Sequence, residues 1–301
     1  MPLTTKPRLI FLPSTYTAQY DGSVEPDADG WTLTGTDHAS SDGDTLTFEN
    51  AGTDLNWYYR ALPSHSATDI IAAVVRVKID SGCTQAYSFL RSATVGKRIS
   101  FQITSDTAIT FYAASNAVVT VDATQWMTIA MFISATQYWA FIDGKLVAQG
   151  TPTAEATYDQ VQFGKMASTD DDVAQYWDRV DYGEADVFDF TLPLDKWNPY
   201  TYDIEANHNE ALDGSLESLF VRQMRMLTFD SRAHTTADLV TLNGHAQNHI
   251  MRGEPFLLIV DKTDMTSTAY NVRHKGKKWT PRLDPQAPTR FSLAWSLRVV
   301  E

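Results

Sequence analysis

The chain has 301 residues, of which 43% are hydrophobic and 12% aromatic, so it predicts a folded protein with a sizeable core and excludes a disordered one. Its formal net charge is −13, and all of this excess lies in residues 1–200, because residues 201–301 contain 12 acidic and 12 basic residues. This charge argues against nucleic acid and anionic membranes as partners. The single cysteine, Cys83, excludes an internal disulfide.

The N-terminal residues contain no apolar run of the length that a secretory signal requires, and no stretch is apolar enough to span a bilayer. We therefore expect synthesis in a reducing cytoplasm and no insertion into a membrane. Residues 1–14 contain three prolines around a short apolar run, which predicts an extended N-terminal arm. Such an arm lies either across a neighbouring subunit or along the edge of its own domain.

Residues 15–198 are predicted to form short strands separated by turns, because apolar and polar residues alternate without a helical period. The clearest signal runs from Trp126 to Gly150, where two alternating apolar segments flank the dipeptide Asp143-Gly144. Asp-Gly between alternating segments is a strong signal of a β-hairpin. The regular spacing of such strands favours an antiparallel β-sandwich of the jelly-roll type.

Two segments of this region also carry a family resemblance. The hairpin ends in I-D-G-K-L-V-A, and Tyr182–Leu194 reads Y-G-E-A-D-V-F-D-F-T-L-P-L. Together they resemble the laminin-G/concanavalin-like lectin sandwich over about residues 15–195. The resemblance implies a concanavalin-like sandwich, a fold on which glycan binding and, in some members, glycoside hydrolysis occur.

The pattern changes near residue 200, where the charge balance also changes, so we expect a linker at 199–215 and a small α+β docking module at 216–301. Thr236 is the predicted N-cap of a helix that ends before Gly253 and Pro255. Strands are expected before and after this helix. His245 and His249 are one turn apart on it, but no carboxylate follows them as in H-E-x-x-H, so we expect both on its surface.

The order of elements in this module resembles small modules at the ends of phage tail and baseplate proteins. The positions that carry the resemblance are Ser231, Arg232, Asp238, Gly253, Pro255, Phe256, Val272 and Arg273. This resemblance implies assembly with other virion proteins and with copies of the same chain.

Three carboxylates form the candidate catalytic set. Glu184, Asp186 and Asp189 are spaced like the E-x-D-x-x-E motif of hydrolases on the concanavalin-like sandwich, with Asp189 in place of the usual acid/base Glu. Because that replacement shortens the side chain, we expect a structural strand with solvated acids. Glu184 as nucleophile and Asp189 as acid/base remain the alternative.

Two further groups are candidates for binding. Trp57, Tyr59, Tyr176 and Trp177 offer rings on which pyranose faces stack, and at least one residue of 57–59 must face outward because side chains alternate along a strand. Asp170, Asp171 and Asp172 would ligate calcium if a loop brought them together, or else form a solvated acidic loop. We expect no other cofactor.

From these features we expect a non-enzymatic structural protein of a tailed-bacteriophage virion, a tail, baseplate or decoration component with a glycan-binding sandwich. Such a protein is made in the host cytoplasm, resides in the virion and contacts other virion proteins and cell-surface glycan. Two alternatives stay open. One is a polysaccharide-degrading sandwich enzyme, and the other is a free bacterial carbohydrate-binding protein.

Overall fold

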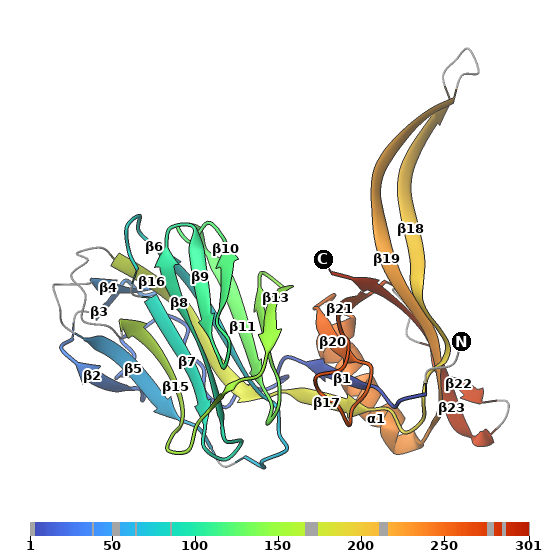
Figure 1. Cartoon of the computed structure of the whole chain (residues 1–301), viewed down its shortest axis with the longest axis horizontal. Coiled ribbons are helices and arrows are strands. Elements are labelled where there is room, and N and C mark those ends of the chain that lie inside the picture. The colour runs from blue at the N-terminus through green and yellow to red at the C-terminus, as the bar shows by residue number, and fades with distance from the viewer. Residues whose placement is uncertain are drawn as a thin grey trace. The chain divides into compact units, whose positions relative to one another are not determined.

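The computed structural model describes residues 4–37, 39–49, 55–63, 65–84, 86–165, 174–210, 216–275, 280–284 and 287–300, with the side chains of 204–223 and 288 outside that description. The chain divides into two compact units (Figure 1). Leu12–Ala185 form one unit, called the sandwich below. Met1–Phe11 and Asp186–Glu301 form the other, called the α+β unit. No helix among the described residues has the length and apolar character needed to cross a membrane.

The sandwich consists of two antiparallel sheets, named here the β5 sheet and the β6 sheet. The β5 sheet runs in the order β10 (Ala117–Thr120), β9 (Ala108–Tyr112), β8 (Lys97–Ser105), β7 (Ala86–Ser92), β15 (Asp159–Lys165), β5 (Asn56–Ala61) and β2 (Thr32–Gly35), with β14 (Thr153–Ala154) on β8. The β6 sheet runs in the order β13 (Lys145–Gly150), β12 (Tyr138–Ile142), β11 (Met127–Ile133), β6 (Ile71–Ile79), β16 (Ala174–Glu184), β4 (Leu46–Glu49) and β3 (Ala39–Ser41). The predicted antiparallel sandwich is confirmed.

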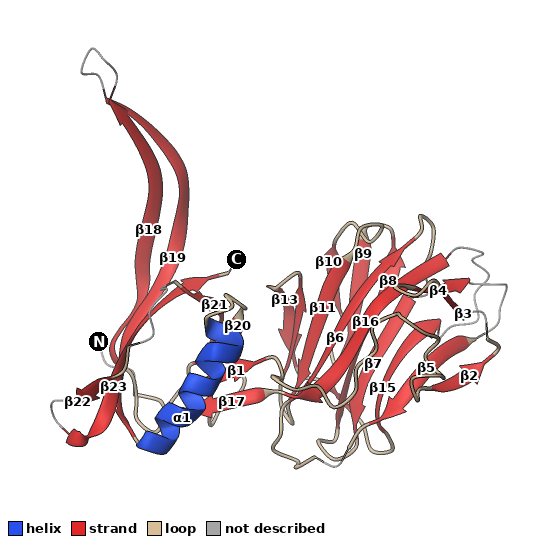
Figure 2. Ribbon diagram, turned by 180° about the vertical axis from the view of Figure 1, so that it is seen from behind, coloured by secondary structure: helices blue, strands red, loops and turns tan. Residues whose placement is uncertain are grey.

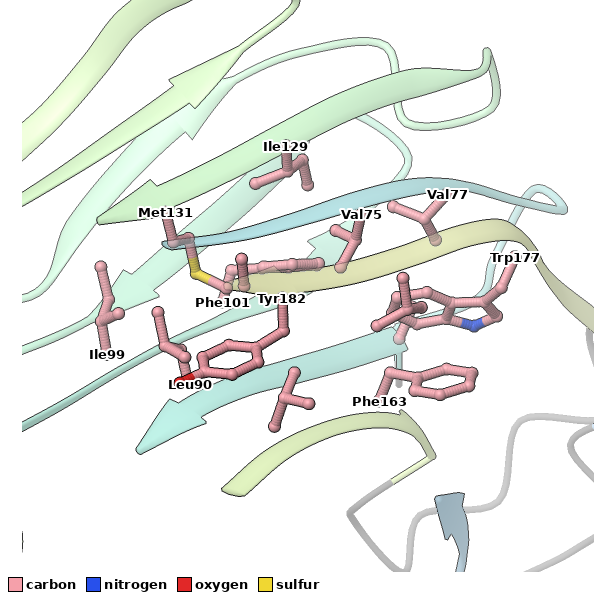
Figure 3. Close-up of a cluster of buried hydrophobic side chains, with 14 of the residues drawn as sticks. Val75, Val77, Leu90, Ile99, Phe101, Ile129, Met131, Phe163, Trp177 and Tyr182 are labelled. Carbon is pink, nitrogen blue, oxygen red and sulfur yellow. The ribbon is translucent and has the colours of Figure 1, made fainter. Parts of the chain in front are cut away.

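The core of the sandwich lies between the two sheets, and Figure 3 shows side chains from both of them meeting there. Its largest contacts are aromatic. Phe163 on β15 packs 5.2 Å from Trp177 on β16, measured between ring centroids, so a single pair bridges the two sheets. Both side chains are fully buried. Phe163 also contacts the rings of Tyr20, Trp31, Phe48 and Tyr58.

The hairpin predicted around Asp143-Gly144 is confirmed as β12 and β13, with Ile142 opposite Lys145. Asp143 and Gly144 have φ values of 50° and 76°, the left-handed conformation that a two-residue hairpin turn requires at both positions. Asp tolerates this conformation better than most residues and Gly tolerates it without cost. The Asp143 side chain also accepts a hydrogen bond from Thr128 N at 2.8 Å, which fixes the turn against β11.

The α+β unit has one antiparallel sheet and one helix, as the sequence predicted. The sheet runs in the order β17 (Asp186–Asp189), β1 (Arg8–Phe11), β20 (Phe256–Ile259), β21 (Ala269–His274), β23 (Ala287–Val299), β19 (Leu216–His234) and β18 (Asp195–Glu210), with β22 (Arg282–Asp284) on β23. β18 and β19 continue as a two-stranded ribbon beyond the part of β19 that pairs with β23, and Figure 1 shows this ribbon leaving the sheet.

The helix α1 (Thr236–His245) begins one residue earlier than predicted, because Thr235 rather than Thr236 is its N-cap. Thr235 Oγ1 accepts a hydrogen bond from Asp238 N at 3.0 Å, and Asp238 Oδ2 accepts one from Thr235 N at 2.7 Å. This reciprocal capping box requires a spacing of three residues, which Thr235 has and Thr236 lacks. The helix continues as a π-helical turn, η1 (Ala246–Ile250), and Figure 2 shows α1 beside the sheet.

The boundaries between the parts of the chain differ from the expected ones. The sandwich ends at Ala185 rather than 198, because β17 pairs with β1 and not with the β6 sheet. Residues 8–11 of the expected arm are β1, which lies between β17 and β20 in the α+β unit. The expected linker at 199–215 is occupied as far as residue 210 by β18. β18 is mostly polar and contains Pro199, so its sequence predicted a linker instead of a strand.

Replacing Phe163 by Ala should destabilise the sandwich by about 3–5 kcal/mol, because it leaves a cavity at the contact between the sheets. Denaturant unfolding followed by tryptophan fluorescence measures this loss. Val118→Ala is the matched control, since Val118 is 71% exposed on β10 and its truncation should change stability by less than about 0.5 kcal/mol. Equal effects of the two substitutions would contradict the assignment of Phe163 to the core.

Candidate functional site

The outer face of the β5 sheet carries a row of aromatic and polar side chains. Tyr58 points into the core, so its neighbours Trp57 and Tyr59 point to the opposite face, where their ring centroids lie 5.7 Å apart. On β7, Leu90 is buried in the same way, and Phe89 and Arg91 lie on the outer face. The strand β15 lies between β5 and β7 and completes the row.

These side chains line a surface pocket of about 640 Å³, called the aromatic groove below. Its lining consists of Thr34, Trp57, Tyr59, Phe89, Arg91, Tyr158, Gln160 and Gln162. Gln162 lies at the centre, because it is the cross-strand partner of Tyr59 on one side and of Phe89 on the other. Gln162 is only 2% exposed, so flanking side chains cover most of this amide.

Arg91 provides the positive charge of the groove. Its guanidinium carbon lies 4.4 Å from the centroid of the Phe89 ring and 5.5 Å from that of Tyr158, so it stacks against both rings. Burial lowers the pKa of Arg91, but a guanidinium remains protonated in proteins. Its Nε atom is buried and has no hydrogen-bond partner among the described residues. The groove therefore combines aromatic faces with one cation, Arg91.

The four residues predicted to bind glycan fall in three different places. Trp57 and Tyr59 line the aromatic groove. Tyr176 lies on the outer face of the β6 sheet, where its hydroxyl donates to Asp80 Oδ2 at 3.0 Å and Lys78 lies over its ring. Trp177 is fully buried in the core, which corrects its expected position at the rim. Alternation along β16 sends the two neighbours to opposite faces, so they cannot form one site.

The other groove residues were not recognised in the sequence. The segment Tyr87 to Arg91 alternates aromatic or basic residues with buried ones, and this alternation predicts one outward face once the segment is identified as a strand. Gln160 and Gln162 give no such signal, because their place beside Phe89 and Tyr59 depends on strand pairing.

The three candidate catalytic carboxylates do not share one environment. Glu184 is the last residue of β16 in the sandwich, whereas Asp186 and Asp189 belong to β17 of the α+β unit. Arg8 donates to both oxygens of Asp189, from Nε at 2.6 Å and from Nη2 at 2.9 Å, and Lys262 Nζ lies 3.3 Å away. Burial opposes the charged form of Asp189, but these two cations outweigh burial and lower its pKa. The carboxyl group is therefore ionised, which is unsuitable for a general acid.

Glu184 has different partners from those expected. One oxygen of Glu184, one of Asp69 and one nitrogen of His65 lie within 4.8 Å of one another. The hydroxyl of Tyr182 hydrogen-bonds to His65 Nε2. Burial raises the pKa of this tyrosine, so it stays protonated. A histidine beside two carboxylates could transfer a proton or contribute to binding a cation. No sequence pattern predicted this group, because His65 is distant from Glu184 along the chain. The candidate calcium ligands Asp170, Asp171 and Asp172 lie outside the described residues.

Comparisons with known proteins identify no family for this chain. No family model matches the chain, and no curated protein matches it. The conserved carbohydrate esterase of Shiga toxin-encoding bacteriophage phi24B is similar in structure, with 16% identity over 56% of this chain and 97% of the esterase and a TM-score of 0.44. The β-glucanase of Bacillus licheniformis has 11% identity over 51% of this chain and 92% of the glucanase, with a TM-score of 0.38.

A sialidase is also similar, with 14% identity and a TM-score of 0.42 over 59% of this chain, which spans only 19% of the sialidase. The names of these structures correct the expectation of a non-enzymatic protein. Most of the similar structures are named as glycosidases, esterases or transglycosylases, so this fold gives no ground for excluding catalysis.

Replacing Asp189 by Asn should destabilise the α+β unit at neutral pH, and this loss should shrink on acidification. The folded-state pKa of Asp189 lies below the unfolded value of about 3.9, so its contribution is present above that value and disappears as pH falls through the folded pKa. Denaturant midpoints of both proteins, measured from neutral to acidic pH, test this. Asp264→Asn, at an exposed position of the same unit, is the control. A difference in denaturant midpoint between wild type and Asp189→Asn that stays constant with pH would contradict the contribution of the ion pair.

Proposed function

We propose that the sandwich recognises a glycan in the aromatic groove of the β5 sheet. The observation that carries this proposal is the combination of four aromatic rings with Arg91, Gln160 and Gln162 in one pocket. Pyranose rings have apolar faces that stack on aromatic side chains and hydroxyl groups that require hydrogen bonds. The groove provides both kinds of contact across neighbouring strands.

The pairing of β5, β15 and β7 determines how a glycan would lie. Tyr59, Gln162 and Phe89 are successive cross-strand neighbours, so an amide lies between two rings in a line across the strands. A chain of sugars in this line would stack on the two rings that flank Gln162. The guanidinium of Arg91 lines the groove and favours a glycan that carries an acidic or hydroxyl oxygen there.

Substituting Trp57 or Tyr59 by Ala should weaken glycan binding by about tenfold each, or ~1.4 kcal/mol, because each removes one stacking ring. The full chain is first screened on an array of plant, fungal and bacterial-surface polysaccharides, and the best ligand is then measured by calorimetry. Mass spectrometry of the same polysaccharides after incubation shows whether the protein also cleaves or deacylates them.

Tyr176→Ala is the matched control, since Tyr176 is a partly exposed aromatic residue on the other sheet. It should leave binding unchanged. Binding that survives loss of Trp57 and Tyr59 but not of Tyr176 would move the site to the β6 sheet. Absence of binding to every polysaccharide would overturn the proposal.

For the α+β unit we propose a role in assembly, as a structural component of a bacteriophage virion that carries the glycan-binding sandwich. The ribbon of β18 and β19 supports it. Residues 216–225 of β19 pair with β18 and with no other strand among the described residues. At ~3.3 Å per residue this ribbon is about 30 Å long, and an isolated two-stranded ribbon is marginally stable in water. Its open backbone edges fit pairing with another strand, from a second copy or another virion protein.

Shortening the ribbon by replacing residues 206–221 with an Asn-Gly turn should abolish self-association while the rest of the sheet remains folded. Light scattering of the intact and shortened chains measures the change in mass, and circular dichroism checks that the shortened chain folds. A monomeric intact chain that is also absent from purified phage particles would contradict the assembly role. Unchanged mass after shortening would place the contact elsewhere.

A further inference from the structure

The α+β unit brings two histidines and a carboxylate to one point. Asp186 is the first residue of β17, and His245 and His249 lie where α1 passes into the π-helical turn. One ligand atom from each residue lies within 4.8 Å of the others. Both histidines were expected on the helix surface, but His249 is only 3% exposed and the side chain of His245 only 12%. The carboxylate that the helix sequence lacks is supplied by a strand.

Both imidazole rings stack on Phe11 of β1, and their own planes are tilted by 35° from each other. The ring of Phe11 lies 5.0 Å from that of His245 and 5.1 Å from that of His249, at interplanar angles of 22° and 16°. Asp186 is the cross-strand partner of Phe11, so the carboxylate and the aromatic ring have a fixed register. The site is therefore built from β17, β1 and the junction of α1 with η1.

A second carboxylate orients His249. Glu254 Oε2 lies 2.9 Å from Nδ1 of His249, and Asp186 Oδ2 lies 3.0 Å from its Nε2. Histidine ligands of metal ions commonly donate their other ring N–H to a carboxylate, which fixes the tautomer and the ring plane. With Glu254 accepting from Nδ1, the Nε2 lone pair of His249 is directed towards Asp186, where His245 also lies.

We propose that Asp186, His245 and His249 bind a divalent transition-metal ion of the zinc class. In a tetrahedral zinc site, with bonds of ~2.0–2.1 Å, ligand atoms lie about 3.3 Å apart. The distances from Asp186 Oδ2 to His249 Nε2 and His245 Nδ1 are 3.0 Å and 3.9 Å, so small side-chain movements would admit an ion. Two imidazoles with one carboxylate favour zinc and its neighbours over calcium or magnesium, which prefer oxygen ligands alone. Three protein ligands leave a fourth position for water or another molecule.

His245 also hydrogen-bonds to the backbone of Val187, and because its buried Nε2 has no hydrogen-bond partner among the described residues, Nδ1 makes this bond. Nδ1 of His245 would therefore exchange the bond to Val187 for a bond to the ion. The site differs from the aromatic groove and from the group around His65, since all its residues belong to the α+β unit. The competing explanation is that a protonated His249 bridges Asp186 and Glu254 without any ion, and the experiment separates the two.

The test uses the full chain without an affinity tag and titrates it with Co²⁺, whose visible absorption reports tetrahedral nitrogen and oxygen ligation. We expect saturable binding of one Co²⁺, displacement by Zn²⁺, and a rise in melting temperature with Zn²⁺. His245→Ala and Asp186→Asn should abolish the spectrum. Glu254→Gln should weaken affinity by about 10–100-fold, as loss of a carboxylate that orients a histidine ligand does.

Gln247→Ala is the matched control, because Gln247 is exposed on the same π-helical turn between the two histidines. It should bind Co²⁺ as the wild type does. Circular dichroism checks that each variant folds. If His245→Ala or Asp186→Asn does not fold, the Co²⁺ affinity of Glu254→Gln still tests the site. Absence of a Co²⁺ spectrum and of a Zn²⁺-dependent melting shift would overturn the proposal in favour of the protonated bridge. Binding that persists in both His245→Ala and Asp186→Asn would also overturn it.

Discussion

The alternation of side chains along β5 and β15 is the constraint on which the sandwich depends. Phe163 and Tyr58 point inward to the aromatic core, where Phe163 meets Trp177 of the opposite sheet. Because side chains alternate along a strand, their neighbours Gln162, Trp57 and Tyr59 point outward. A slip of one residue in either strand would bury the polar residues of the groove and expose the core. Stability and the composition of the groove are therefore set by the same register.

The sequence predicted the local features of this fold well. Alternation and the Asp143-Gly144 turn were sufficient for the central hairpin, because a two-residue turn with left-handed backbone angles is encoded within a few residues. Three adjacent aromatics required at least one of residues 57–59 to face outward, and the structure places Trp57 and Tyr59 there. Trp177 was misplaced because its neighbour Tyr176 shares its residue type, and composition does not say which of two alternating residues is inside.

The features that the sequence did not predict depend on contacts between distant segments. Phe89 and Trp57 line one pocket only because β15, far along the chain, pairs between their strands. His249 contacts a carboxylate 63 residues away in the sequence, so the residues that follow it on the helix do not predict this contact. The end of the sandwich at Ala185 was missed for the same reason, because β17 was recognised as a strand but its pairing with β1 is not a local property.

The pairing of β1 with β17 and β20 has a consequence for synthesis. Residues 8–11 leave the ribosome early, yet their partners at 186–189 and 256–259 follow only after the whole sandwich has been made. The sandwich contains all its own strands and can fold as soon as it emerges, whereas β1 stays unpaired until β17 follows the sandwich and lacks its second partner until β20 is made. This delay leaves Leu9, Ile10 and Phe11, all fully buried in the finished fold, exposed on the nascent chain. Completion of the α+β unit is thus a late, long-range pairing that joins residues 8–11 to strands made after the whole sandwich.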